Sequence, residues 1–348
     1  MIPLLVSVAL AQSPPATWAR VDVGSVVVMR PVGGAFGFGF DNAFDPVDGV
    51  PPFREAFLAA LNGREQAYDF ALVFLSEGLP NQISDALAFN QTFNRELEGM
   101  GTRQFTTEGV PVRGALYMNR ASRWDEFPPA IDRWIFNHEL GHFWLAYPFV
   151  DLGAGREDAL LGRQLAHWSY FVHTGGSPME GNAWIDNGDG SFTTDPTVSG
   201  DFSDLDLYLM GMLPAEQVAP FFVIDPIESF GRGPASNPDH FALEPESTTI
   251  LGDRIDVTVS DIIASEGPVS PGPGEAPTSF RLLTLVVAGP EEVLSERNVQ
   301  RIRALQSEFV TYWSEGTRQL SSVSFELADE GLSMPPLAGP TWIPGGAR

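Results

Sequence analysis

The sequence predicts an α+β protein, and three observations support that prediction. β-branched and aromatic residues form runs of strand length, such as residues 24–30 (GSVVVMR) and 68–75 (YDFALVFL). Apolar residues recur at helical spacing in residues 130–147 and 291–316. The chain has 348 residues, of which 43% are hydrophobic, so it can bury a large core as one elaborated domain or as two.

The first half is predicted to alternate between strands and helices. Its expected strands are residues 24–30, 68–75 and 114–119. A glycine-rich turn is expected at residues 33–39. The expected helices are residues 52–62, where Pro51 and Pro52 suit a helix start, residues 84–100, where Leu87, Phe93 and Leu97 have apolar spacing, and residues 130–147, which Pro148 would end.

The second half is predicted to begin with a loop and to end with a long helix. Residues 175–206 are rich in Gly, Asn, Ser and Asp, which is typical of loops. A short helix or turn is expected at residues 205–213, strands at residues 215–223, 254–263 and 280–288, and the long helix at residues 291–316.

The chain is expected to divide into four regions. Residues 1–11 (MIPLLVSVALA) are apolar and end in a small-x-small pattern, which predicts a secretory signal peptide and a periplasmic or extracellular location; a buried strand is the alternative. Residues 20–217 form the principal domain. Residues 218–330 are an α/β subdomain or the completion of that domain, and residues 331–348 are a Pro/Gly-rich tail. No run reaches the ~18–20 apolar residues of a membrane span.

Two residue types are missing, and their absence excludes several chemistries. All 20 basic residues are arginine, and the chain has no cysteine. Disulfides, zinc ribbons, thiol nucleophiles, Walker-type P-loops and Schiff bases are therefore excluded. The net charge of −25 argues against binding to nucleic acid or to an anionic membrane. Any metal ligand must be His, Asp or Glu.

Residues 138–142 (HELGH) match the pattern HExxH inside a predicted helix. Because residues four apart lie on one face of a helix, His138 and His142 can bind one metal ion. Glu139 is displaced by about 100° around the helix, so it can border the metal without binding it. Zinc lowers the pKa of its bound water toward ~7, and Glu139 can take the proton. A buried helix with two merely hydrogen-bonded histidines is the alternative.

In this setting HELGH resembles the motif of the zincin metallopeptidases, over residues 84–213. The resemblance implies a zincin-like α+β fold, in which a twisted mixed sheet carries the motif helix and a lower subdomain of loops, strands and a long C-terminal helix follows. Residues 20–217 would then be the catalytic domain, with residues 68–75 as a central strand and 114–119 as the edge strand that pairs with substrate. The metzincin continuation is absent, because Leu145 and Pro148 replace its glycine and third histidine.

A catalytic zinc requires three protein ligands and an open position, so one more ligand is expected after the motif. His167 is the preferred candidate, because it lies in an aromatic segment (LAHWSY) and the chain has only five histidines. Glu180 and Glu157 are the alternatives, since gluzincins place a glutamate on a downstream helix. Asp151 and Asp206 are further carboxylates within range.

Four further residues are candidates for the same site. Metzincins place a methionine in a tight turn beneath the zinc, and Met179 in SPMEG and Met210 in LMG resemble it, although ordinary packing is the favoured interpretation of each. Tyr170 and Tyr208 are candidate phenols that stabilise an oxyanion, with a structural tyrosine as the alternative.

An acidic segment predicts a second metal, calcium. Six aspartates fall within residues 186–206, and Asp186 and Asp189 in DNGDG are the candidate ligands. The spacing is not that of an EF-hand, and a pair of Asx or glycine turns is the alternative.

Together these features predict an exported zinc metallopeptidase, an endopeptidase rather than an exopeptidase, that acts on proteins or peptides. One alternative is a secreted binding or adhesion protein on an inactive zincin fold. Another is a zinc amidase that acts on a non-protein amide such as cell-wall peptide. Glu139 favours an enzyme, because a binding protein does not need a general base between two ligands. No oligomeric state is predicted.

Overall fold

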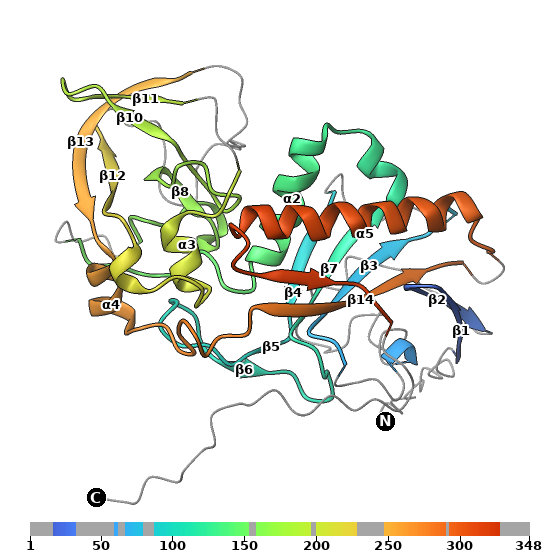
Figure 1. The fold of residues 1–348 in the computed structure, drawn as a ribbon. Helices are drawn as coiled ribbons and strands as arrows, with labels where there is room; N and C mark the ends of the chain where they lie inside the picture. The colour runs from blue at the N-terminus through green and yellow to red at the C-terminus, as the bar shows by residue number, and fades with distance from the viewer. Residues whose placement is uncertain are drawn as a thin grey trace, which may run out of the picture.

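The computed structural model describes residues 17–32, 59–61, 67–78, 87–152, 158–195, 200–227, 247–289 and 292–327. These residues form a seven-stranded sheet, a six-stranded sheet and a small two-stranded sheet, with a few helices packed beside them (Figure 1). The predicted α+β class is confirmed. No helix among the described residues has both the length and the apolar character that crossing a membrane requires.

The seven-stranded sheet is mixed and has the order β1-β2-β14-β3-β7-β4, with β15 beside β14. Its strands are β1 (Thr17–Val23), β2 (Val26–Val32), β3 (Phe70–Leu75), β4 (Phe89–Thr92), β7 (Gly114–Arg120), β14 (Ser279–Val287) and β15 (Ser322–Ser324). Strands β2, β14, β3 and β7 run parallel, and β1 and β4 are antiparallel to their neighbours.

Strand β3 is buried along its whole length, as the apolar run at residues 68–75 predicts. Phe70, Leu72 and Phe74 belong to the core on the helical side of the sheet. The alternate residues belong to a second core on the opposite face. Burial on both faces is the usual environment of a parallel strand, and it explains why the run is continuous rather than alternating. The prediction of a central strand here is confirmed.

Two helices, α2 (Pro129–Gly141) and α5 (Glu296–Gly316), lie side by side on one face of this sheet (Figure 1). Phe136 of α2 stacks on Phe309 of α5, with 4.2 Å between ring centroids. Ile302 and Leu305 extend the apolar stripe of α5 into the same core. The long C-terminal helix therefore supports the motif helix, and the expectation that it belongs to a lower subdomain is wrong.

The six-stranded sheet has the order β10-β11-β13-β12-β8-β9. Its strands are β8 (Trp168–His173), β9 (Glu180–Asn182), β10 (Trp184–Asp186), β11 (Ser191–Thr194), β12 (Phe221–Pro226) and β13 (Thr249–Val257). Helices α3 (Asp204–Leu209) and α4 (Val259–Glu266) are short. Both sheets combine strands from before and after residue 217, because β14 and β15 join the first sheet and β12 and β13 join the second.

The helix predicted at residues 84–100 is wrong, because residues 87–100 contain strands. β4 pairs with β7, and β5 (Asn94–Arg95) pairs with β6 (Phe105–Thr106). The Asn94 side chain donates hydrogen bonds to the carbonyls of Val110 and Val112, at 2.7 and 2.5 Å. These non-local contacts override the local apolar spacing.

The identity of the edge strand is also corrected. β7, which covers residues 114–119, lies between β3 and β4 and is not an edge. Among the described strands the edge on this side is β4, within the segment predicted to be helical. A resemblance between motifs gives no register for strands outside the motif, so it does not identify the edge strand.

Three smaller boundaries differ from prediction. The motif helix ends at Gly141 rather than at residue 147. The expected loop at residues 175–206 contains β9, β10 and β11. The strand expected at residues 254–263 ends at Val257, and α4 follows because Thr258 and Asp261 form a capping box.

Several predictions concern residues outside the described part of the chain. They are the signal peptide at residues 1–11, the turn at residues 33–39, most of the helix at residues 52–62, Glu157 and the tail at residues 331–348. They stay predictions.

Asp132 on α2 is a buried carboxylate whose Oδ1 has no hydrogen-bond partner. Burial raises the pKa of Asp132 to about 7; Arg301 opposes the rise, and Glu308 and Asp125 add to it. Between its ordinary pKa of 3.8 and about 7, the folded protein keeps a proton that the unfolded chain releases. The free energy of unfolding therefore falls as pH rises through this window, and it stays lower above it.

We expect Asp132→Asn to raise the Tm, and to raise it more at about pH 8 than at about pH 5, because the amide never ionises. The gain at the higher pH should be a few degrees, since ~1 kcal/mol corresponds to roughly 2–4 °C in a domain of 150–250 residues. Asp125→Asn, at an exposed carboxylate of the same cluster, is the control and should shift the Tm little at either pH. Thermal melts that show the same gain for Asp132→Asn at both pH values would contradict the raised pKa.

Candidate metal centre

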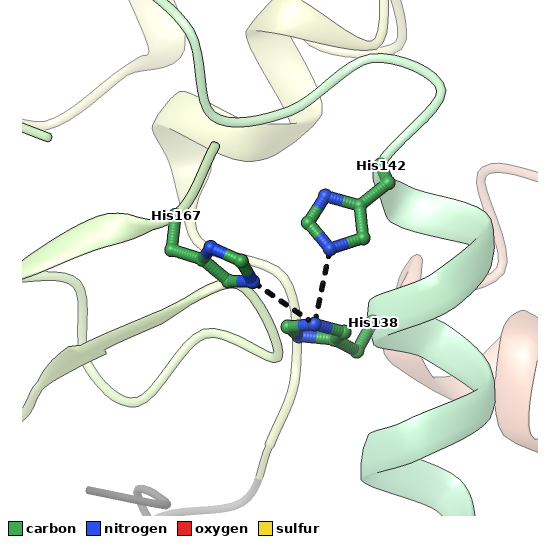
Figure 2. Close-up of side chains that lie close together, drawn as sticks. All are labelled: His138, His142 and His167. Carbon is green, nitrogen blue, oxygen red and sulfur yellow. Dashed lines mark hydrogen bonds between the residues drawn. The ribbon is translucent and has the colours of Figure 1, made fainter. Parts of the chain in front are cut away.

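Three histidine side chains converge where the end of α2 meets the six-stranded sheet (Figure 2). His138 lies on α2, His142 is the residue that caps it, and His167 directly precedes β8. The Nε2 atom of His138 lies 3.1 Å from that of His142 and 3.3 Å from that of His167. Among the described residues, this histidine group is the one set of three or more His, Asp or Glu side chains close enough to hold a metal ion.

Backbone carbonyls determine which ring nitrogen of these histidines carries the proton. His138 Nδ1 lies 2.7 Å from the Pro178 carbonyl, and His167 Nδ1 lies 2.9 Å from the Arg163 carbonyl. A carbonyl oxygen can only accept, so each Nδ1 donates its proton and each Nε2 keeps a lone pair. The lone pairs of the two rings are thereby directed at a common point, as they are in histidines that bind metals.

The spacing and the protonation state of the histidine group suit a divalent metal ion. Zinc–nitrogen bonds of ~2.0–2.1 Å at tetrahedral angles place the ligand nitrogens about 3.3 Å apart, close to the separations here. Burial lowers the pKa of all three imidazoles, to about 3 for His142, and so keeps them neutral. The C-terminal end of a helix also favours a cation. The histidine group can therefore bind a metal ion.

Glu139 lies next to this group and is 8% exposed. Burial raises its pKa to about 8, and the charge of Arg163 and a hydrogen bond from the backbone of Asn90 oppose the rise. Asn90 belongs to β4, so this bond connects the glutamate to the edge strand of the first sheet. The carboxylate is not within the metal-binding group, in agreement with its position on the helix.

A buried arginine holds the end of the motif helix in place. Arg95 donates to the backbone carbonyls of Phe143 and His142, at 3.0 and 3.1 Å. The Tyr147 hydroxyl donates to the same His142 carbonyl, at 2.6 Å. The last carbonyls of a helix have no partner within it, and a cation there also interacts favourably with the helix dipole. This contact explains why the helix ends near Gly141, well before Pro148.

The SPMEG segment forms a turn that packs against the motif helix. The Pro178 carbonyl accepts the His138 bond, and a side chain on Gly141 would collide with the sulfur of Met179. The buried carboxylate of Asp206 connects this turn to the third histidine, because it accepts hydrogen bonds from Ser177 and from the indole of Trp168. Asp206 is thus a supporting residue and not a member of the metal-binding group.

The alternatives to His167 as third ligand are placed differently. The Glu180 carboxylate lies 3.8 Å from His167 Nε2, but it forms an ion pair with Arg163. Asp151 is described and is not part of the histidine group.

The remaining candidates lie in packed surroundings. The ring of Tyr170 packs edge-on against Trp184, and the Tyr208 hydroxyl accepts a hydrogen bond from the backbone N–H of Val269. Met210 is buried in the main core.

The candidate calcium residues stabilise a hairpin turn between β10 and β11. Asp186 accepts a hydrogen bond from the backbone of Gly188 and pairs with Arg254, and Asp189 accepts from the backbone and hydroxyl of Ser191. These bonds are the Asx turns expected in the alternative interpretation. Calcium binding stays a prediction.

Sequence reasoning overlooked two arginines, Arg95 and Arg163. Each reaches the centre from a segment that is distant from the motif in sequence, and an arginine four residues before a candidate histidine is not by itself a signal. Their roles depend on tertiary contacts alone.

Comparisons of the chain with protein-family models, with curated proteins and with solved structures found no match. Without a match, only the chemistry of the site itself bears on the function of the protein.

Proposed function

We propose that the protein is a zinc-dependent peptidase of the zincin type, and that it is exported, as the apolar residues 1–11 predict. One observation carries the proposal: three neutral imidazoles, of which those of His138 and His167 are buried and that of His142 is partly buried, present their Nε2 atoms to one point, with the Glu139 carboxylate beside them. This is the donor set of a catalytic zinc that keeps an open position, together with the general base that peptide hydrolysis needs.

The three histidines and Glu139 would have different roles in hydrolysis. A zinc ion held by His138, His142 and His167 would supply a Lewis acid that polarises a carbonyl, lowers the pKa of water and favours the ionised form of Glu139. Glu139 would take a proton from the attacking water and give it to the leaving amine. Its neutral state without metal follows from its raised pKa.

The edge strand β4 is the proposed site for the peptide chain. Its outer side has no neighbour among the described strands, and Asn90 on it contacts Glu139. An extended peptide that added to this edge would pass beside the histidine group, and backbone hydrogen bonds would hold it with little dependence on sequence. This arrangement favours an endopeptidase.

We expect hydrolysis to require zinc. The full chain, stripped with a chelator, should not cleave denatured casein or a mixed peptide library, and addition of about one zinc ion per chain should restore cleavage. Mass spectrometry of the products measures both the activity and the bonds cut. A protein that contains one zinc per chain and cleaves neither substrate would refute the proposed function.

A further inference from the structure

Arg163 is joined to the histidine group by its backbone and by its side chain. It begins the short 3-10 turn Arg163–Leu165, and its carbonyl accepts the His167 Nδ1 bond. Its Nε and Nη2 atoms both contact Glu180 Oε1, at 2.6 and 2.5 Å. The same Oε1 lies 3.8 Å from His167 Nε2, so the guanidinium lies within the immediate surroundings of the centre.

The ion pair leaves part of the guanidinium available. An arginine has five N–H donors, and Glu180 takes up Nε and Nη2 through one oxygen atom. The third nitrogen, Nη1, has no hydrogen-bond partner among the described residues. The Arg163 side chain is 33% exposed, whereas that of Glu180 is 7% exposed. A buried carboxylate therefore anchors a partly exposed cation next to the histidine group.

The guanidinium of Arg163 lies beside the histidine group, because the Glu180 oxygen that it contacts at 2.5 Å is itself 3.8 Å from His167 Nε2. A negative charge that develops in the same space would be stabilised by the same cation.

We propose that Arg163 is the catalytic residue that stabilises the oxyanion of the scissile carbonyl, and that Glu180 is a positioning residue that holds it there; this proposal rests on the proposed function. In the step concerned, the water oxygen forms a bond to the carbonyl carbon and Glu139 takes the water proton. The C=O π pair moves to the carbonyl oxygen, where Nη1 donates a hydrogen bond. Collapse of this adduct breaks the C–N bond, and Glu139 gives the proton to the departing nitrogen.

The test compares Arg163→Met and Arg163→Lys with Arg254→Met, a matched control. Arg254 is also ion-paired, to Asp186 and Asp256, but it lies on β13, outside the histidine group. Loss of one oxyanion donor lowers kcat by about 10²–10³-fold, so Arg163→Met should show this loss with a KM changed far less. Arg163→Lys should be intermediate, because it keeps the charge but not the forked donors. Arg254→Met should match the wild type.

A second readout does not depend on turnover. A phosphinic peptide, in which P–CH2 replaces the scissile amide of the best library substrate, mimics the charged adduct, and calorimetry measures its affinity for the zinc-loaded proteins. Arg163→Met should lose affinity for it by a factor similar to its loss in kcat, with zinc content and circular dichroism unchanged. Glu180→Gln should lose less affinity for the phosphinic peptide than Arg163→Met does.

The outcomes separate this proposal from the proposed function. An Arg163→Met protein that keeps its zinc, its kcat within about threefold and its affinity for the phosphinic peptide would overturn the role of Arg163 while the peptidase assignment stands. If the loss of kcat in Arg163→Met were explained entirely by a loss of zinc, the role of Arg163 would be overturned as well. A zinc-loaded wild type that cleaves nothing would overturn both.

Discussion

Replacement of Glu139 by glutamine is expected to lower kcat by about 10²–10⁴-fold, the range that general-base catalysis contributes. Glutamine has nearly the same shape, so it fits the same buried position beside β4. It cannot accept a proton from water, and the step that precedes C–N cleavage loses its base. Zinc content should not change, because the carboxylate is not within the histidine group. A peptide-cleavage assay should therefore show the loss of hydrolysis, and elemental analysis should show that the variant keeps its zinc.

Asp132→Asn is the matched control for this prediction. It makes the same carboxylate-to-amide change on the same helix, at a buried residue about two turns before Glu139 that is not part of the histidine group. Its kcat should stay near the wild-type value, although its Tm should rise. A Glu139→Gln protein with full zinc and more than about a tenth of wild-type activity would remove Glu139 from the mechanism. If it lost its zinc instead, Glu139 would have to be a ligand.

The part of the site that could be predicted is the part encoded locally. His138, Glu139 and His142 lie within five residues of one helix, so the helical repeat alone decides which side chains share a face. The buried strand at residues 68–75 was predictable for a similar reason, since a continuous apolar run is what burial on both faces requires.

The features that could not be predicted depend on residues distant in sequence. Arg95 ends the motif helix from 47 residues upstream of His142, and Pro148, the apparent stop signal, lies beyond the actual end. The edge strand β4 exists because it pairs with β7, although its own sequence has the apolar spacing of a helix. Local propensity is a weak guide wherever a partner strand supplies the hydrogen bonds.

The sequence alone leaves His167 as one of several candidates for the third ligand, because its position also depends on residues that are distant in sequence. The sequence places it 25 residues after His142, and no periodicity connects the two. In the folded chain, the segment before β8 returns to the end of α2, where Asp206 holds the adjacent Trp168 and the turn at Ser177 in a common network. The histidine group is therefore assembled by tertiary contacts around a motif that supplies two of its three members.

His167→Ala is expected to weaken zinc binding by about 10²–10³-fold, since four-ligand zinc sites bind with about 10–16 kcal/mol in total and each ligand contributes a share. The remaining two histidines would leave the ion exposed to water. Zinc stabilises the folded protein according to its free concentration relative to Kd, so the rise in Tm on addition of zinc should largely disappear in this variant. Competition with a chromophoric chelator gives the affinity directly.

Two matched variants make this result specific to His167. His173→Ala removes a histidine from β8, the strand that His167 directly precedes. Its ring accepts the backbone N–H of Trp184 and stacks on Phe222, and the variant should keep wild-type zinc affinity. Glu180→Gln tests the alternative ligand. It should lose less zinc affinity than His167→Ala, by about 10–100-fold, which is typical of residues that contact a ligand rather than the metal. If Glu180→Gln lost zinc and His167→Ala kept it, the third ligand would be the glutamate, and the ion pair with Arg163 would have to open on metal binding.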